Sequence, residues 1–446
     1  MIDLREWFAE HHVTEVECLV PDITGIPRGK ITPAQKFLDG GALRLPEAIF
    51  IQSVTGEYPP DEEDRLTDPA IIDITLKADA STVRLVPWAR EPTAQIIHDC
   101  HYKNGDPVPM APRQVLQRVL ALYADKGWEP ILAPELEFYL VGRNTDPDYP
   151  LTPPIGRSGR QETGRQSYSV DAVNEFDPLF EEMYDFCEVQ ELDLDTLIHE
   201  EGAGQVEINF LHGEPLTRAD QVFLFKRTVR EVALRHDIYA TFMAKPMSRE
   251  PGSAMHVHQS IIDPVTKQNL FAGEDGKASK LFRNYLGGLQ KYTPAVMPIL
   301  APNVNSYRRL SRHSNAPINL EWGYDNRTCG LRVPYGAPSA MRVENRVPGA
   351  DANPYLAFAA TLACGYMGMI EELEPTKPFE GSAYSMPYAL PREISHALDI
   401  MEQCKPMHDL LGSKMIEVIV AVKKLEYETY LHVISSWERE HLLLNV

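Results

Sequence analysis

Glutamate and histidine residues alternate with apolar residues in four short segments of the chain. The segments are PELEFYL (134–140), GQVEINF (204–210), SAMHVHQS (253–260) and MRVENRV (341–347). Successive side chains of a β-strand point to opposite faces, so each segment, read as a strand, has one apolar face and one face rich in Glu, His or Arg. One such segment could equally be a solvated surface strand, but four of them, all without lysine, indicate a shared site.

Five glutamates and one histidine form a candidate metal site. They are Glu135, Glu137, Glu200, Glu207, Glu344 and His256, of which Glu200 stands in the segment IHEEGAG. Carboxylates about 4 Å apart repel by about 1 kcal/mol in water and by about 4 kcal/mol at an effective dielectric of about 20, so a cluster of five needs cations to be stable. Carboxylate oxygens together with one imidazole suit Mg²⁺ or Mn²⁺.

A set of arginines stands close to these segments in the sequence: Arg309, Arg327, Arg332, Arg342 and Arg346. Guanidinium groups bind carboxylates and phosphates bidentately, and divalent ions with arginines hold the phosphates of a nucleotide during phosphoryl transfer. Each arginine alone could be an ordinary surface ion pair. Next to the Glu and His segments, the set favours a site for ATP-dependent phosphoryl transfer.

Two regions of different local structure must position these residues. Up to about residue 105 the sequence predicts mainly strands and turns, as in EVECLVPDITGIPRGKI, and the polar stretch KNGDPVPMAP follows. Beyond that stretch, predicted strands alternate with predicted helices. We therefore expect two domains, residues 1–106 and 107–446.

Helix boundary signals are found in the second region. Pro112 suits the first turn of a helix, and Thr217 suits the N-cap of another. Asn353 and Pro354 together predict a third helix start.

The composition is that of an ordinary soluble protein. The 446 residues include 64 acidic and 43 basic side chains, for a net charge of −21, which disfavours binding to a nucleic acid backbone. The six cysteines are scattered without a CxxC pair, which fits a reducing compartment. With neither a signal peptide pattern nor an apolar run long enough to cross a membrane, we expect a cytoplasmic protein without nucleic acid or membrane partners.

Several motifs, in their order along the chain, resemble those of the glutamine synthetase family. They are PELEFYL, HEEGAGQVEINF, KPMSREPGSAMHVHQS, NSYRRL, NRTCGLRVP and RVENRVPGADANPY. The resemblance implies an α+β protein with a small N-terminal β-grasp domain and a large catalytic α/β domain built on a funnel-shaped antiparallel sheet. It also implies a homo-oligomer, a hexameric ring or a stacked dodecamer, with each active site between neighbouring subunits.

The resemblance implies a role for each candidate residue. One metal ion would be bound by Glu137, Glu200 and Glu207, and another by Glu135, His256 and Glu344, with two or three Mg²⁺ or Mn²⁺ ions in each site. ATP would be bound by His258, Ser260 and Arg342. The transferred phosphate would be bound by Arg327 and Arg332, and L-glutamate by Gly252, Arg309 and Arg346.

The sequence departs from the family pattern at the ammonium pocket. The Asp-Gly-Ser-Ser motif that binds ammonium is replaced by a different segment, LRLPEAIFIQSVTGEY, and the glutamate of the flap that closes the site is replaced by Asn315. The Asn-Gly pair before His256 is changed to Pro251-Gly252. These changes resemble the γ-glutamylpolyamine synthetase branch, so we expect an ATP-dependent ligase that joins glutamate to a primary amine or polyamine through γ-glutamyl phosphate.

The acceptor chemistry leaves several alternatives open. The protein could be a glutamine synthetase that uses ammonia, or a non-catalytic structural or regulatory relative of the same fold, with a guanidino kinase as a more distant alternative. Asn315 cannot act as a base, and Glu47 or Glu57 could replace the lost carboxylate or be ordinary surface residues. Tyr388 stands near the position where some glutamine synthetases are adenylylated, but its flanking residues differ, so its modification is left open.

Overall fold

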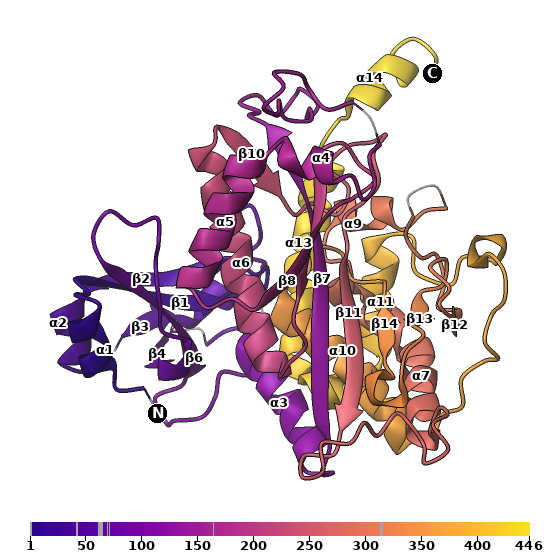
Figure 1. The fold of residues 1–446 in the computed structure, drawn as a ribbon, viewed down its shortest axis with the longest axis horizontal. Coiled ribbons are helices and arrows are strands. Elements are labelled where there is room, and N and C mark those ends of the chain that lie inside the picture. Colours follow the sequence, from indigo (N-terminus) through magenta and orange to yellow (C-terminus); the bar gives the residue numbers. More distant parts are fainter. Residues whose placement is uncertain are drawn as a thin grey trace.

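The fold was determined as a computed structural model (Figure 1). It describes residues 2–41, 43–60, 66–68, 70, 72–163, 165–312 and 315–446. The strands among these residues form two sheets, and the smaller, N-terminal sheet lies to one side of the larger one (Figure 1). The chain passes from the first sheet to the second between His101, where β6 ends, and Pro112, where α3 begins.

The N-terminal sheet has six strands, with the order β2-β1-β6-β4-β3 and with β5 paired to β6. Its strands are β1 (Glu15–Pro21), β2 (Pro27–Pro33), β3 (Arg44–Pro46), β4 (Asp73–Ala78), β5 (Arg84–Leu85) and β6 (Thr93–His101). The central neighbours β1 and β6 are parallel, whereas the other pairs are antiparallel.

Two short helices cover this sheet, α1 (Leu4–Glu10) and α2 (Ala34–Leu38). Phe8 and Ala34 bring the apolar sides of these helices into a small core with Val16, Cys18 and Ile96 of the strands. This burial removes apolar surface from water, which is what holds the helices on the sheet.

The larger sheet has eight strands, with the order β12-β13-β14-β11-β7-β9-β8 and with β10 paired to β7. Its strands are β7 (Glu129–Gly142), β8 (Leu194–His199), β9 (Gln205–Phe210), β10 (Ile238–Thr241), β11 (Met255–Ile262), β12 (Trp322–Tyr324), β13 (Leu331–Val333) and β14 (Val343–Asn345). All neighbours are antiparallel except β12 and β13. The expected antiparallel sheet and a strand in each of the four alternating segments are therefore confirmed.

The strand in MRVENRV is shorter than predicted. A 3-10 turn, Pro338–Ala340, ends directly before the first residue of this segment. The Met341 N–H closes the turn by donating to the Pro338 carbonyl at 3.2 Å. As a result β14 begins only at Val343, and Arg342 and Arg346 lie beyond its two ends.

Helices cover the apolar face of the larger sheet. The helices of this region are α3 (Pro112–Ala124), α4 (Val170–Asn174), α5 (Asp177–Val189), α6 (Pro215–Arg235), α7 (Lys280–Tyr292), α8 (Met297–Leu300), α9 (Val304–Arg309), α10 (Pro354–Ile370), α11 (Ile394–Gln403), α12 (Lys405–Leu411), α13 (Ser413–Leu431) and α14 (Ser436–Leu442). Of these, α14 has no buried residue and lies apart from the sheet (Figure 1). Leu136 and Phe138 of β7 are fully buried against this layer, and the Phe138 and Phe225 rings lie 6.2 Å apart. Across the described part of the chain, none of the helices combines the length and the hydropathy needed to span a bilayer.

Helix α10 is the centre of the helical layer and contacts α3, α6 and α7. It lies close to α7 because glycines stand at the crossing. A Cβ on Gly288 would meet the Cys364 carbonyl oxygen at 2.3 Å and the Gly368 Cα at 2.6 Å. Burial of α10 on nearly all sides explains why its sequence, PYLAFAATLACGYMGMI, is almost entirely apolar.

The predicted helix starts were correct in two of three cases. Helix α3 begins at Pro112, and α10 begins at Pro354 with the Asn353 side chain accepting from two backbone N–H groups. The prediction that Thr217 is an N-cap is wrong. Glu214 caps α6, and its carboxylate accepts from the Thr217 N–H at 2.7 Å, because Pro215 already takes up the first helical turn.

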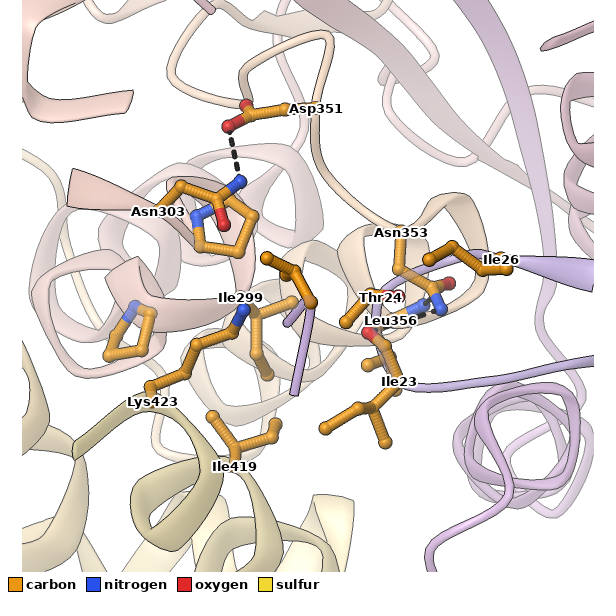
Figure 2. A pocket seen from close by; sticks show the side chains of 13 residues that line it. Ile23, Thr24, Ile26, Ile299, Asn303, Asp351, Asn353, Leu356, Ile419 and Lys423 are labelled. Carbon is orange, nitrogen blue, oxygen red and sulfur yellow. Dashed lines mark hydrogen bonds between the residues drawn. The ribbon is translucent and has the colours of Figure 1, made fainter. Parts of the chain in front are cut away.

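The turn between β1 and β2 joins the N-terminal sheet to the helices of the larger region. Asn353 donates from Nδ2 to the Asp22 carbonyl at 2.8 Å. A cavity of about 140 Å³ remains beside this contact. Figure 2 shows Ile23 of the turn facing Ile419 of α13 across this cavity. The two regions therefore pack directly on each other.

Candidate functional site

The register of the larger sheet brings the acidic and imidazole side chains together. Glu135 of β7 is directly opposite His256 of β11. On the other side of β7, Glu137 is opposite Glu207 of β9. Because β7 lies between β9 and β11, these polar side chains project from neighbouring positions of one sheet face.

The ligand atoms of this cluster lie close to one another. Glu135 is within 2.8 Å of the His258 Nε2 and within 3.5 Å of the His256 Nδ1, and Glu344 is within 3.7 Å of the same His256 atom. Two groups of three have all their ligand atoms within 4.8 Å of one another: Glu135, Glu207 and His256, and Glu135, His258 and Glu344. The first group combines residues of both expected ligand sets, and the second includes His258, which was expected to bind ATP. The assignment of each residue to a particular ion stays a prediction.

The buried carboxylates repel one another. Burial, and next the neighbouring Glu200, raises the pKa of Glu137 to about 8. Burial and then Glu135 raise the pKa of Glu207 well above its usual range, and burial is also the main cause of the raised pKa of Glu200. Glu200 itself follows the last residue of β8, as expected for a residue outside a strand.

Glu135 and His256 behave differently from these three carboxylates. Burial opposes the ionisation of Glu135, but the neighbouring imidazoles of His256 and His258 hold its pKa below the ordinary range. Burial, and after it Arg346, lowers the pKa of His256 to about 4, so the imidazole is neutral near pH 7. A neutral imidazole is the form that binds a metal ion.

These residues fit divalent cations. The Nδ1 atom of His256 is buried and has no hydrogen-bond partner, although it faces the carboxylates of Glu135 and Glu344. A buried polar atom without a partner is costly, and a metal ion would satisfy it. The donor set of carboxylate oxygens with imidazole nitrogen matches that of Mg²⁺ or Mn²⁺ sites.

Glu344 lies beside the cluster, within 3.7 Å of the His256 Nδ1. Its side chain is fully buried and accepts a 2.7 Å hydrogen bond from Arg332 and another from Arg346. Burial opposes its ionisation, but Arg346 and then His256 lower its pKa to about 2. The carboxylate is therefore charged throughout the physiological range.

A cavity of about 260 Å³ opens over the cluster. It is lined by most of the predicted metal, phosphate and glutamate residues: Glu135, Glu137, Glu200, Glu207, His256, Gly252, Arg309, Arg327, Arg332 and Arg346. We call it the glutamate cavity. Carboxylates form one part of its wall and guanidinium groups another, so it can hold anionic groups bridged by cations.

Gly252 and Arg309 are packed tightly at the wall of the glutamate cavity. Arg309 is buried and donates to the Val347 and Arg346 carbonyls at 2.8 and 2.9 Å. A Cβ on Gly252 would lie 2.5 Å from the Arg309 Cγ and 2.7 Å from the Ala244 carbonyl oxygen. Only glycine fits there without moving the arginine.

A second cavity, of about 360 Å³, lies on the other side of Glu135. It contains the three residues expected to bind ATP, His258, Ser260 and Arg342, and we call it the nucleotide cavity. Arg342 donates from Nε to the His258 Nδ1 at 3.1 Å. Glu135 and Asn209 line both cavities, so the two spaces meet at the cluster.

Gln205 was missed by the sequence interpretation. It is buried and donates from Nε2 to Glu137 at 3.3 Å and to the Gly252 carbonyl at 3.1 Å. It holds a carboxylate of the cluster next to the glutamate cavity. Its position two residues before Glu207 places it on the same strand face, which is a signal that the alternation already contained.

Tyr168 and Glu201 of the glutamate cavity were also missed. Tyr168 has a φ of 63°, and its N–H donates to the His199 carbonyl at 2.9 Å. Glu201 accepts hydrogen bonds from Arg165 and from Asn315. No local pattern marks Tyr168 and Glu201. Their loops meet each other and the loop of Asn315 only in the folded chain.

The two carboxylates considered as replacement bases lie elsewhere. Glu47 is buried in the N-terminal region and accepts from the Tyr102 hydroxyl at 2.5 Å, and Glu57 accepts from the Thr55 hydroxyl at 3.0 Å. Within this chain, neither is among the described residues that line the two cavities.

The chain is similar to known proteins over nearly its whole length. Residues 109–442 match the model of the glutamine synthetase catalytic domain. A glutamate–isopropylamine ligase of a Pseudomonas species is 31% identical over 451 residues, covering 98% of this chain and 96% of that protein. The γ-glutamylputrescine synthetase PuuA of Escherichia coli K12 is 33% identical over 448 residues, covering 96% and 92%. Glutamine synthetases stand among the further relatives.

A solved structure shows the same fold. It is described as a GmaS/ADP complex, and it superposes with a TM-score of 0.85 at 27% identity, over 99% of this chain and 100% of that one. The family match, the relatives and the shared fold agree with the two cavities that meet at a carboxylate cluster. This chain belongs to the glutamine synthetase family.

Proposed function

We propose that this protein is an ATP-dependent ligase that joins the γ-carboxyl group of L-glutamate to a primary amine or polyamine. The observation that carries the proposal is the meeting of the nucleotide cavity and the glutamate cavity at Glu135. This arrangement allows a phosphate chain in one cavity to reach a carboxylate in the other across a cation-binding cluster.

In the first step, an oxygen of the γ-carboxylate attacks the γ-phosphorus of ATP, the bond to the bridging oxygen breaks, and ADP leaves. Arg342 and His258 bind the nucleotide, and Arg309 and Arg346 bind the carboxylates of glutamate. Arg327 and Arg332 stabilise the negative charge on the transferred group. Divalent ions bound by the carboxylate cluster would neutralise further charge there.

In the second step, the nitrogen of a neutral amine attacks the carbonyl carbon of γ-glutamyl phosphate. The carbon–oxygen bond breaks, phosphate leaves with the electron pair, and the nitrogen gives up one proton. Water would hydrolyse the acyl phosphate, so this step requires that water be kept from the site.

Two observations support an amine larger than ammonium as the acceptor. Asn315, at the position of the flap glutamate, lines the glutamate cavity, and its amide cannot accept a proton from ammonium. Two relatives are named for isopropylamine and for putrescine.

Phosphate release with ATP, glutamate and Mg²⁺ tests the proposal against a panel of ammonium, methylamine, isopropylamine, ethanolamine, putrescine and spermidine. We expect release that depends on glutamate and is stimulated more by a primary amine than by ammonium. If ammonium is the best acceptor, the protein is a glutamine synthetase. If it fails to bind ATP with Mg²⁺, it is a non-catalytic relative.

We infer further that residues 1–106 form a β-grasp domain and residues 107–446 the catalytic domain. The parallel central pair β1 and β6 in an otherwise antiparallel sheet supports the first inference. We also infer two or three ions in each site, a hexameric or dodecameric ring, and a cytoplasmic location. Sedimentation velocity distinguishes the oligomers, and metal analysis after dialysis counts the ions.

A further inference from the structure

One carboxylate in the glutamate cavity has no role in the proposed reaction. Among the described residues, five glutamates line this cavity: Glu135, Glu137, Glu200, Glu201 and Glu207. Four of them belong to the cation-binding cluster. Glu201 is the remaining one, and 28% of its side chain is exposed.

Glu201 is held in place from two sides. Arg165 donates from Nη1 to its Oε1, and Asn315 donates from Nδ2 to its Oε2. Arg165 also donates from Nη2 to the Arg249 carbonyl at 3.0 Å, so the guanidinium itself is positioned. Each carboxylate oxygen has two lone-pair sites, and one accepted hydrogen bond leaves each oxygen free to accept another.

Arg165 does not cancel the charge of Glu201. The Arg165 side chain is 54% exposed, and water screens such an exposed ion pair strongly. The carboxylate therefore still offers a negative charge to a cation that enters the glutamate cavity.

The surroundings of Glu201 suit an ammonium group. Tyr168 lines the same cavity and is fixed next to the end of β8 by its hydrogen bond to the His199 carbonyl, only two residues before Glu201. The faces of aromatic rings such as that of tyrosine attract organic cations. Arg327 and Arg309, on the same cavity, mark the places proposed for the phosphoryl group and for glutamate.

We propose that Glu201 binds the protonated head of the acceptor amine and is the main determinant of its affinity. This inference rests on the proposed ligase function. Asn315 stands where the flap glutamate is expected, and it donates a hydrogen bond to Glu201. The glutamate cavity therefore has a carboxylate next to the flap position, but it comes from a different loop. The ligand class is a primary alkylammonium ion, which gives one proton to solvent before its nitrogen attacks γ-glutamyl phosphate.

The test compares the wild type with Glu201→Gln, which keeps the size of the side chain and removes its charge. We expect the KM for the best amine to rise roughly 10- to 100-fold, as for the loss of a hydrogen bond to a charged group, with the KM values for ATP and glutamate within about twofold. Glu201→Asp should restore part of the amine affinity. Hydroxylamine, which is mostly neutral near neutral pH, should lose much less affinity than the alkylammonium substrate.

The variant Arg165→Gln distinguishes amine binding by Glu201 from a purely structural role of Glu201. That variant removes the partner of Glu201 but keeps its charge, so our proposal predicts an amine KM that is unchanged or lower. If Arg165→Gln and Glu201→Gln raise the amine KM equally, Glu201 only joins the loops and the proposal is wrong. It is also wrong if Glu201→Gln leaves the amine KM unchanged.

Two controls complete the design. Glu250→Gln changes a carboxylate that accepts from the Ala203 N–H of the same loop at 3.2 Å but is outside the described lining of the cavity, and it should leave the amine KM unchanged. Glutamate-dependent ADP release by the wild type must be present with at least one amine. If no amine supports it, the proposed function itself fails; if it is normal and Glu201→Gln behaves as the wild type, only this inference fails.

Discussion

Arg332 donates a 2.7 Å hydrogen bond to Glu344, the residue directly opposite it in the β13–β14 register. Arg346 donates to the other oxygen of the same carboxylate. One fully buried glutamate thus orients two arginines of the glutamate cavity and faces the imidazole of His256.

Replacing Glu344 by glutamine should destabilise the protein, because Arg332 and Arg346 would lose a buried charged partner. We expect the free energy of unfolding, measured with urea, to fall by about 3 kcal/mol, the range for breaking a buried ion pair. Glu371→Gln is the matched control, since its pair with Lys291 is partly exposed and should change stability by less than about 1 kcal/mol. Equal losses in the two variants would contradict the buried ion-pair interpretation.

Removing divalent cations should make stability depend on pH through the raised pKa of Glu137. A carboxyl group whose pKa in the folded protein, about 8, exceeds its ordinary value, 4.5, stabilises the fold below the lower value and loses that contribution as pH rises to the higher one. The melting temperature of the chelator-treated protein should therefore fall between about pH 5 and about pH 8, and the increase caused by Mg²⁺ should be larger at about pH 8.5 than at about pH 6. A Mg²⁺ effect that shrinks as pH rises would contradict this prediction.

Gly252→Ala should impair glutamate binding. The added Cβ would lie 2.5 Å from the Arg309 Cγ, so the guanidinium that is proposed to bind glutamate must shift. We expect the KM for glutamate to rise about tenfold or more, while ATP affinity, measured by calorimetry, stays within about twofold. Gly336→Ala is the control, because its nearest atom, the Ala340 Cβ, is 3.6 Å away. An unchanged glutamate KM would place the substrate elsewhere.

Arg342→Gln should act on the nucleotide alone. Its guanidinium lines the nucleotide cavity and orients His258 through a 3.1 Å hydrogen bond, but it is not among the described residues of the glutamate cavity. We expect the KM for ATP to rise roughly 10- to 100-fold with little change in the KM for glutamate. Arg309→Gln should show the opposite pattern, and variants that change both constants alike would contradict two separate binding spaces.

The sequence by itself determined the family and predicted most of the residues of the candidate site. The alternation in four segments identified which side chains share a strand face, since a strand repeats every two residues whatever lies around it. The motifs identified the family, and the glutamates, histidines and arginines named from them meet around Glu135.

Only the tertiary structure decided how those residues group and what completes them. The cation-binding groups depend on which strands are neighbours, and that pairing put Glu135 next to His256 and His258. Arg165, Glu201 and Asn315 come together from three loops separated by up to 150 positions along the chain. No periodic signal joins such loops, because their contacts are set by the packing of the elements that carry them and not by local conformation.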